Sequence, residues 1–201
     1  MTEIIVIHGP PGSGKSVQSE RLATEGLPNR AVMHVSAGNR LRGIRTGEIA
    51  SAYSDKVNPE PGKRVLLDHS IMTGVIFEYI NQVSEASIVL VDGYPRFVEA
   101  IPCFLETSRR NNHEIVGCVN LNISRRVSLD RVLGRGGREG EVGTSNMTEL
   151  AEKRFQEHLN YTVPAIDAMG RVTRLVNLDA EESIEKVWRL FYRAIFELAI
   201  T

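Results

Sequence analysis

Cysteine, net positive charge and long apolar runs are all scarce in this chain. Its 201 residues include two cysteines, Cys103 and Cys118, and these lack the paired spacing of a metal site. Their scarcity favours buried free thiols in a reducing compartment. The formal net charge of −1 gives no overall positive field that would attract nucleic acid or an anionic membrane. No apolar run reaches the about 20 residues that a membrane span needs.

These absences predict a cytoplasmic protein with no nucleic-acid partner and no membrane partner. A strand-like run begins at Glu3, which leaves no room for a signal peptide. The composition, 42% hydrophobic and 24% charged, is that of a globular domain with a substantial core. Since no repeat, low-complexity tract or linker divides the chain, we expect a single domain.

A phosphate-binding pattern stands near the start of the chain. Residues 9–16 read Gly-Pro-Pro-Gly-Ser-Gly-Lys-Ser, which matches G-x-x-x-x-G-K-[ST]. A β-branched run at 3–8 precedes the pattern, and helix formers at 17–25 follow it. A strand, a glycine-rich turn and a helix together place backbone N–H groups and a positive helix end around an anion. Lys15 can then reach the β- and γ-phosphates of a nucleoside triphosphate, and the Ser16 hydroxyl can ligate Mg²⁺.

Strand-like and helix-like segments alternate through the rest of the chain. The expected strands lie at 3–8, 31–35, 87–92, 115–121 and 172–178. The expected helices lie at 17–25, 39–54, 63–82, 97–110, 124–135, 147–169 and 183–198. This alternation is typical of an α/β protein with a parallel sheet that helices cover on both faces.

Asp92 ends the apolar strand expected at 87–92. A carboxylate at the end of a buried strand is costly unless it serves a metal or a hydrogen-bond network. In P-loop enzymes this position holds Mg²⁺, usually through water. We therefore predict a magnesium site at Ser16 and Asp92.

The motifs around Asp92 give the chain a family resemblance. Asp-Gly-Tyr-Pro-Arg ends at Arg96, and residues 36–42 read Ser-Ala-Gly-Asn-Arg-Leu-Arg. Together with the loop at 9–16, Asp-Arg-Val-Leu-Gly-Arg at 130–135 and Lys-Arg-Phe at 153–155, they make the chain similar to the adenylate kinase family of nucleoside monophosphate kinases. The resemblance covers essentially the whole chain. It implies a P-loop NTPase fold of three α/β/α layers with a five-stranded parallel sheet.

The resemblance also implies how the chain is divided. The core would comprise 1–35, 81–134 and 147–201, with a helical acceptor-binding insert at 36–80 and a short lid at 135–146. It further implies a monomer that uses ATP with Mg²⁺ as donor and a nucleoside monophosphate as acceptor.

The resemblance assigns roles to individual residues as well. The implied catalytic residues are Lys15, Arg96, Arg131 and Arg154. The ATP site would contain Gly9, Gly12, Ser13, Gly14, Lys15, Ser16, Val17, Arg131 and Arg135. The monophosphate site would contain Ser36, Ala37, Arg42, Val65, Gly93, Arg96 and Glu99. Guanidinium groups suit this chemistry because they neutralise the charge on a transferring phosphoryl group without needing a base.

Four positions depart from the family pattern. Ser16-Val17 replaces the usual Gly-Thr after the loop lysine, and Ala37-Gly38-Asn39 replaces Thr-Gly-Asp. In the family, a glutamine a few residues after the Pro-Arg pair recognises adenine. This chain has no clear counterpart, and Glu99 is the residue nearest to that place. The lid motif Gly-Arg-x-Asp-Asp falls on Val-Gly-Thr-Ser-Asn at 142–146, so that Arg138 is the candidate for its arginine.

The leading hypothesis is transfer of the ATP γ-phosphoryl group to a nucleoside monophosphate, with AMP the first choice of acceptor. Alternatives are a UMP/CMP-type kinase, a weakly active or non-catalytic nucleotide-binding module with a degraded lid, and a kinase of another small acceptor such as a sugar acid. The retained Arg42 and Arg96 favour a monophosphate acceptor over a sugar. The absence of Asn-Lys-x-Asp disfavours a GTPase. His8 abuts the loop and is a candidate for a phosphate contact.

Overall fold

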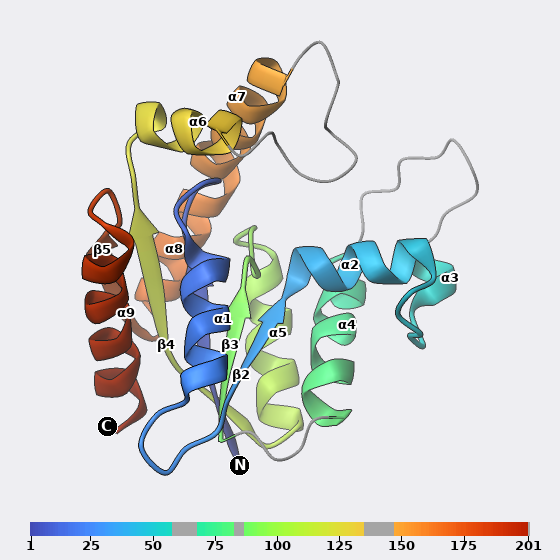
Figure 1. Cartoon of the computed structure of the whole chain (residues 1–201). Helices are drawn as coiled ribbons and strands as arrows, with labels where there is room; N and C mark the ends of the chain where they lie inside the picture. The colour runs from blue at the N-terminus through green and yellow to red at the C-terminus, as the bar shows by residue number, and fades with distance from the viewer. Residues whose placement is uncertain (58–67, 83–86, 135–146, 201) are drawn as a thin grey trace.

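The computed structural model describes residues 1–57, 68–82, 87–134 and 147–200 and has a five-stranded parallel sheet at its centre (Figure 1). The strands are β1 (Thr2–His8), β2 (Val32–Ser36), β3 (Ile88–Asp92), β4 (His113–Asn122) and β5 (Arg174–Asp179). Their order across the sheet is β2-β3-β1-β4-β5, and every neighbouring pair is parallel. The fold class predicted from the sequence is confirmed.

Strands β1 and β3, two of the three interior strands, are largely apolar because helices cover both of their faces. All five residues of β3 are buried. In β1, Ile4 and Val6 belong to one core cluster and Ile5 and Ile7 to the other, as the two-residue period of a strand requires.

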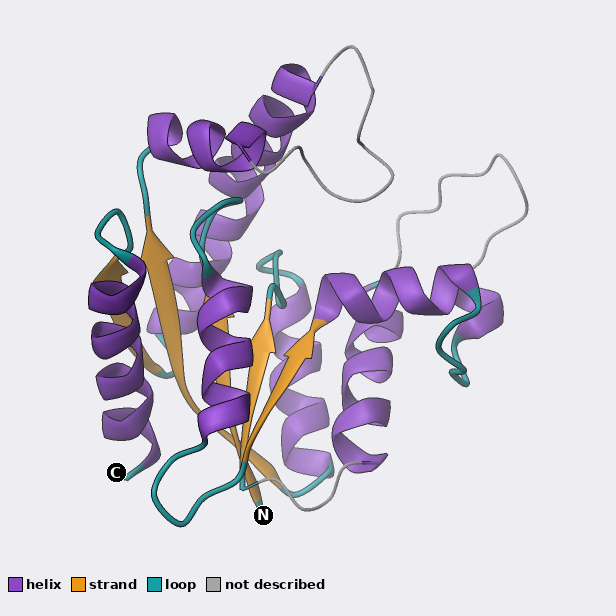
Figure 2. Ribbon diagram, in the orientation of Figure 1, coloured by secondary structure: helices purple, strands orange, loops and turns teal. Residues whose placement is uncertain are grey.

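Two layers of helices enclose the sheet (Figure 2). On one face, α1 (Lys15–Glu25) and α9 (Ile184–Ala199) contribute Leu22 and Phe191 to the core. On the other face lie α4 (His69–Gln82), α5 (Ala100–Arg110) and α8 (Val163–Gly170), which contribute Ile76, Phe104 and Met169. Each face of the sheet therefore has its own core. Neither helix layer covers the edge at which the carboxyl ends of the strands lie.

The segment after β2 builds a small helical unit beside this open edge. It contains α2 (Ala37–Thr46), α3 (Ser54–Val57) and α4, which share a third cluster around Ile44, Val57 and Val75. The packing is close: a Cβ on Gly74 would lie 2.2 Å from the ring of Tyr53. Helices α2 and α3 and most of α4 lie within the predicted acceptor-binding insert, whose boundaries stay a prediction. Val65 lies outside the described residues.

The helix expected over 147–169 is wrong in one respect, because it contains a wider turn. The structure has α7 (Met147–Glu157), a π-helical stretch at His158–Thr162, and then α8. Pro164 explains the interruption. Its nitrogen carries no hydrogen, and its ring would clash with the carbonyl of Asn160 in a continuous α-helix.

Other element ends differ from the expected ones for local reasons. Gly47, with φ +79°, ends α2, so that residues 47–53 are not helical. Helix α5 begins only at Ala100, after a turn over 97–99. The last strand begins at Arg174, because the Val172 N–H closes a turn onto the Met169 carbonyl.

Helix α6 (Arg125–Gly134) lies beside α7 above the sheet (Figure 1). The predicted N-cap is confirmed, since Ser124 Oγ accepts a hydrogen bond from the Val127 N–H at 3.4 Å. Both cysteines are free, and burial raises the pKa of Cys118 to about 12. Among the described residues, no helix is long and apolar enough to cross a bilayer.

Candidate active site

The loop at 9–16 forms the cradle that its sequence predicts. Gly9, Gly12 and Gly14 have φ angles of +151°, +80° and +85°, in the region that favours glycine. At Gly9 even a methyl group is excluded, because a Cβ would lie 2.5 Å from Ser13 Oγ and 2.7 Å from the Leu121 carbonyl oxygen. Gly14 precedes α1 and offers no side-chain cap. The amino end of α1 therefore faces the loop as a site for an anion.

Helix α6 fastens this loop from behind. Ser128 Oγ donates to the Pro11 carbonyl at 2.6 Å. Arg131 donates to the Gly12 carbonyl at 3.4 Å and to the carbonyls of Ala180 and Glu181 at 2.8 and 3.1 Å. The structure thus places Arg131 between the loop and the segment after β5, where its neighbour Val132 lines the cleft.

Ser16 and Asp92 meet at the end of β3. Ser16 Oγ donates to Asp92 Oδ2 at 2.6 Å, and His34 Nε2 lies 3.5 Å from the same oxygen. Asp92 is only 3% exposed, and its Oδ1 has no hydrogen-bond partner among the described residues. Burial acts to raise the pKa of Asp92, but His34, Lys15 and Ser16 outweigh it and hold the pKa below its ordinary value.

This pair fits Mg²⁺. An ionised buried carboxylate with an unused oxygen, beside a hydroxyl, presents the hard oxygen ligands that the ion prefers. Among the described residues there is no group of three or more His, Cys, Asp or Glu that could hold a metal by itself. Mg²⁺ does not require such a group, because it usually binds through one or two carboxylates together with water and substrate phosphates.

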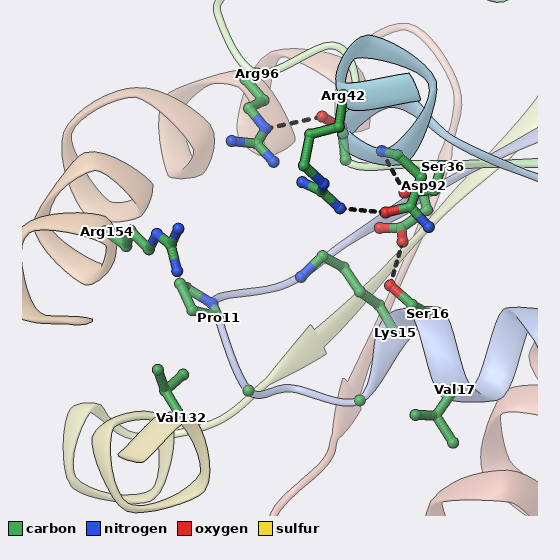
Figure 3. Close-up of a pocket in the computed structure, with 15 residues that line it drawn as sticks. Pro11, Lys15, Ser16, Val17, Ser36, Arg42, Asp92, Arg96, Val132 and Arg154 are labelled. Atoms are coloured by element: carbon green, nitrogen blue, oxygen red, sulfur yellow. Dashed lines mark hydrogen bonds between the residues drawn. The ribbon is translucent and has the colours of Figure 1, made fainter. Parts of the chain in front are cut away.

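A cleft of about 230 Å³ connects the loop with the helical unit (Figure 3). Lys15, Arg42, Arg96 and Arg154 line it, and Asp92 is the only carboxylate that the described part of the chain contributes to it. Figure 3 shows the three arginines arranged around the side of the loop toward which Lys15 extends. Arg96 is oriented by a hydrogen bond from its Nε to the Gly93 carbonyl at 2.9 Å, and Arg42 by one to Asn39 Oδ1. Four cations facing one carboxylate make a site for several phosphate groups.

A second cavity, of about 360 Å³, opens from Arg42, Gly93 and Arg96 toward the helical unit. Ala37 lines it together with residues to which the sequence analysis assigns no site role: Gly38, Leu41, Arg45, His69, Met72, Tyr94 and Phe97. Of these, only Arg45 could have been found from sequence spacing, because it lies three residues after Arg42 and so on the same face of α2.

Tyr94 forms a fixed wall of this second cavity. Its hydroxyl lies 2.7 Å from that of Thr73 and donates to the His69 carbonyl at 2.9 Å. Burial raises the pKa of Tyr94 to about 12, which keeps the hydroxyl protonated.

The predicted site residues fall into four groups. The structure brings most of them to the cleft: Gly12, Gly14, Lys15, Ser16, Val17, Ser36, Arg42, Asp92, Gly93, Arg96 and Arg154 line it. Another group lies beside the cleft without lining it, namely Gly9, Ser13, Ala37 and Arg131. Glu99 is exposed and lines none of the three cavities that meet at Arg96. Val65, Arg135, Arg138 and the predicted lid lie outside the described residues.

A strand, a glycine-rich loop and a helix, with a lysine, a serine and the aspartate of the neighbouring strand, define a P-loop nucleotide-binding protein. A family described as "AAA domain" matches residues 8–151, which is more than half of the chain. The chain belongs to this family, and it is adenylate kinase-like.

Curated relatives agree with this assignment over nearly their full lengths. An adenylate kinase of Stenotrophomonas maltophilia is 26% identical over 188 residues, covering 91% of this chain and 94% of that protein. Adenylate kinases of Xanthomonas euvesicatoria and Helicobacter hepaticus are each 27% identical, over 194 and 192 residues. These alignments cover 95% and 93% of this chain, and 98% and 94% of the relatives. The predicted family resemblance is confirmed.

Proposed function

We propose that the protein transfers the γ-phosphoryl group of Mg²⁺-ATP to a nucleoside monophosphate. The observation that carries this proposal is the meeting of two cavities at Arg42, Gly93 and Arg96, one beside the phosphate loop and one beside the helical unit. A donor and an acceptor held in these cavities would present their phosphates to the same cluster of cations. Such positioning is most of what phosphoryl transfer requires.

Each cation has a place in this scheme. Lys15 extends from the loop toward the donor phosphates, and Arg42 and Arg96 hold the monophosphate of the acceptor. Arg154, on the opposite wall of the cleft, stabilises the charge that develops on the transferring group. Ser16 and Asp92 hold Mg²⁺, which neutralises the donor phosphates when bound. No general base is needed, since the attacking oxygen belongs to an ionised phosphate.

AMP is the proposed acceptor, as the names of the relatives suggest. The second cavity would then hold the base of the acceptor, and we call it the acceptor cavity. Its walls include Leu41, Met72 and Phe97, and its polar groups include His69 and Arg45. A UMP/CMP-type kinase is the second candidate. Glu99, the residue nearest to the family's adenine-reading glutamine, lies away from this cavity and cannot read the base there. Use of Mg²⁺, a monomeric state and a cytoplasmic location stay predictions.

A coupled assay over AMP, CMP, UMP, GMP and their deoxy forms identifies the acceptor. The variant that tests the acceptor site is Arg96→Ala. We expect it to raise the KM for the monophosphate by at least about tenfold, because a charge-assisted hydrogen bond contributes about 1.5–3 kcal/mol. The affinity for ATP should stay within about twofold. Arg109→Ala, on the exposed end of α5, is the control for loss of an arginine.

Two outcomes would contradict the proposal. Absence of transfer to every monophosphate, with ATP binding intact, would favour the non-catalytic nucleotide-binding module. Equal weakening of ATP and monophosphate binding in Arg96→Ala would make Arg96 a structural residue.

A further inference from the structure

A third cavity, of about 470 Å³, extends from the cleft in a direction that phosphoryl transfer does not use. Its mouth is shared with the cleft and carries Lys15, Arg96 and Arg154. Beyond the mouth lies a part that we call the inner chamber, lined by His8, Phe97, Glu157, His158, Tyr161 and Thr162. The whole cavity falls within the size range of small-molecule sites.

His8 is the unexplained group of this chamber. It is 0% exposed, and neither of its ring nitrogens has a hydrogen-bond partner among the described residues. A buried polar side chain without a hydrogen bond is costly, and most such groups in proteins are satisfied. His8 belongs to the lining of the cavity, and a turn of its buried ring toward the chamber lets a molecule there supply the missing hydrogen bond.

The charge state of His8 indicates which chemical group suits it. Burial, reinforced by His158 and Arg96, lowers its pKa to about 3. Burial also lowers the pKa of His158 to about 4, with Lys15 and Arg96 acting in the same direction. Both imidazoles are therefore neutral near pH 7, and each offers one N–H donor and one nitrogen acceptor. A hydroxyl group, which both donates and accepts, matches this pair of functions better than a phosphate does.

The back wall of the chamber is the π-helical stretch His158–Thr162. It contributes three residues to the lining, namely His158, Tyr161 and Thr162. The wider π turn brings them toward one cavity, and π turns are frequent at functional sites. Glu157 and the Thr162 hydroxyl add further hydrogen-bonding groups, so the chamber is polar where the mouth is cationic.

Phe97 separates the inner chamber from the acceptor cavity. Its ring centroid lies 5.2 Å from that of Tyr161, on the chamber side, and 5.4 Å from that of His69, on the acceptor side. The two cavities share only Gly93, Arg96 and Phe97. An anionic group at Arg96 can thus carry its body into either cavity, but not into both.

We propose that the inner chamber is a second ligand site, which takes a small hydroxylated anion with its anionic group at Arg96 and Arg154 and a hydroxyl at His8. A sugar phosphate and a hydroxy acid share this chemistry. The site goes beyond the proposed transfer reaction, although it shares the two arginines with it. Its occupant competes with the acceptor monophosphate for Arg96 and does not occupy the acceptor cavity.

Direct binding to the full chain, measured by calorimetry without ATP or turnover, tests this site independently of kinase activity. The probes are ribose 5-phosphate, gluconate, inorganic phosphate, and pentyl phosphate, which matches ribose 5-phosphate but has no hydroxyl on its chain. We expect at least one hydroxylated probe to bind about tenfold more tightly than pentyl phosphate, the usual effect of one satisfied hydrogen bond. Preference for ribose 5-phosphate assigns a phosphate ester, and preference for gluconate assigns a hydroxy acid.

Variants of the chamber then locate the bound probe. His8→Leu should reduce its binding to the level of pentyl phosphate, whereas His8→Gln keeps a donor and an acceptor and should restore part of the difference. Thr162→Val gives an independent test of the chamber if changes at His8 disturb the fold. His113→Gln, at the start of β4, is the control.

In steady-state assays, the probe should inhibit competitively against the monophosphate, and His8→Leu should relieve that inhibition without changing the monophosphate KM. The proposal is overturned by equal binding of hydroxylated and plain probes, by undiminished binding in both His8→Leu and Thr162→Val, or by binding of none of the probes. Binding of inorganic phosphate as tight as that of every other probe would show an adventitious ion only.

Discussion

At the scale of single residues, the cleft depends on charges that the fold holds in place before any phosphate arrives. Lys15 and Asp92 come from adjacent elements, the start of α1 and the end of β3. Each has a neighbour that limits its freedom: the Pro10 carbonyl accepts from Lys15 Nζ at 3.3 Å, and Ser16 donates to Asp92 at 2.6 Å. Fixed charges of this kind stabilise a transition state without reorganising during the reaction.

Loss of the loop lysine is therefore expected to affect transfer more than folding. Lys15→Ala should lower kcat by about 10²–10³-fold, the usual effect of losing one preorganised donor. The melting temperature should change little, because the ammonium group contributes to a surface cleft and not to the core. Steady-state kinetics beside thermal unfolding checks this prediction, and near-normal turnover would sink the transferase proposal.

The buried His8 should make the protein less stable in mild acid. Its folded pKa of about 3 lies below the ordinary value of 6.5, so below pH 6.5 the unfolded chain gains a proton that the folded chain does not bind. Stability is then lost progressively as pH falls from 6.5 toward 3. Between pH 7 and pH 5 the loss from His8 is about 2 kcal/mol.

Urea unfolding of the wild type and of His8→Leu at both pH values isolates this contribution. Other groups, His158 among them, titrate in both proteins, so the difference between the two pH-induced losses belongs to His8. A variant that loses as much stability as the wild type would contradict the burial argument.

At the scale of elements, the helical unit beside β2 relies on glycines where helices approach closely. A Cβ on Gly74 would meet the Tyr53 ring at 2.2 Å, which no side-chain adjustment of a few tenths of an ångström relieves. We expect Gly74→Ala to destabilise the protein by about 1–3 kcal/mol, as overpacking does. Because α2 and α4 line the acceptor cavity, monophosphate affinity should fall more than ATP affinity.

Gly134→Ala is the matched control, since none of the described residues places an atom within 4 Å of a Cβ at that position. Denaturant unfolding and calorimetric titration of both nucleotides measure the two effects. A Gly74→Ala protein with unchanged stability would show that the turn containing Tyr53 can move away from α4 without cost.

Elements were predictable from sequence where the signal is local. The apolar run of β3, the glycines of the loop and Ser124 each determine their structure within a few residues. Pro164 predicts an interruption of the helix over 147–169 but not its form, so the π-helical stretch does not follow from the sequence.

Spatial neighbours were harder to predict, since they depend on packing between distant segments. The ring of Phe97 packs at a tilt against those of His69 and Tyr161 from two other elements, and nothing in its own neighbourhood of the sequence indicates this. Glu99 was placed in the acceptor site by its separation from Arg96. The turn over 97–99 instead leaves it exposed, immediately before α5.

At the scale of the whole molecule, the cleft and the acceptor cavity meet at Arg42 and Arg96, and under the proposed function this lets donor and acceptor bind at the same time. A bisubstrate analogue joining ATP and AMP should bind with one-to-one stoichiometry and exclude both nucleotides. At a free concentration 100 times its Kd it should stabilise the fold by about 2.7 kcal/mol. Calorimetry and thermal unfolding measure the two quantities, and binding of two analogues per chain would show that the cavities act separately.

The hydrogen bonds from Ser128 and Arg131 to the loop carbonyls also have a mechanical meaning. Helix α6 carries an exposed ion pair between Arg126 and Asp130 on its outer surface, while its inner surface grips Pro11 and Gly12. A tilt of α6, whether caused by a neighbouring molecule or by a change of charge at Arg126 and Asp130, would therefore displace the two carbonyls that it contacts and, with them, the loop proposed to hold the phosphates.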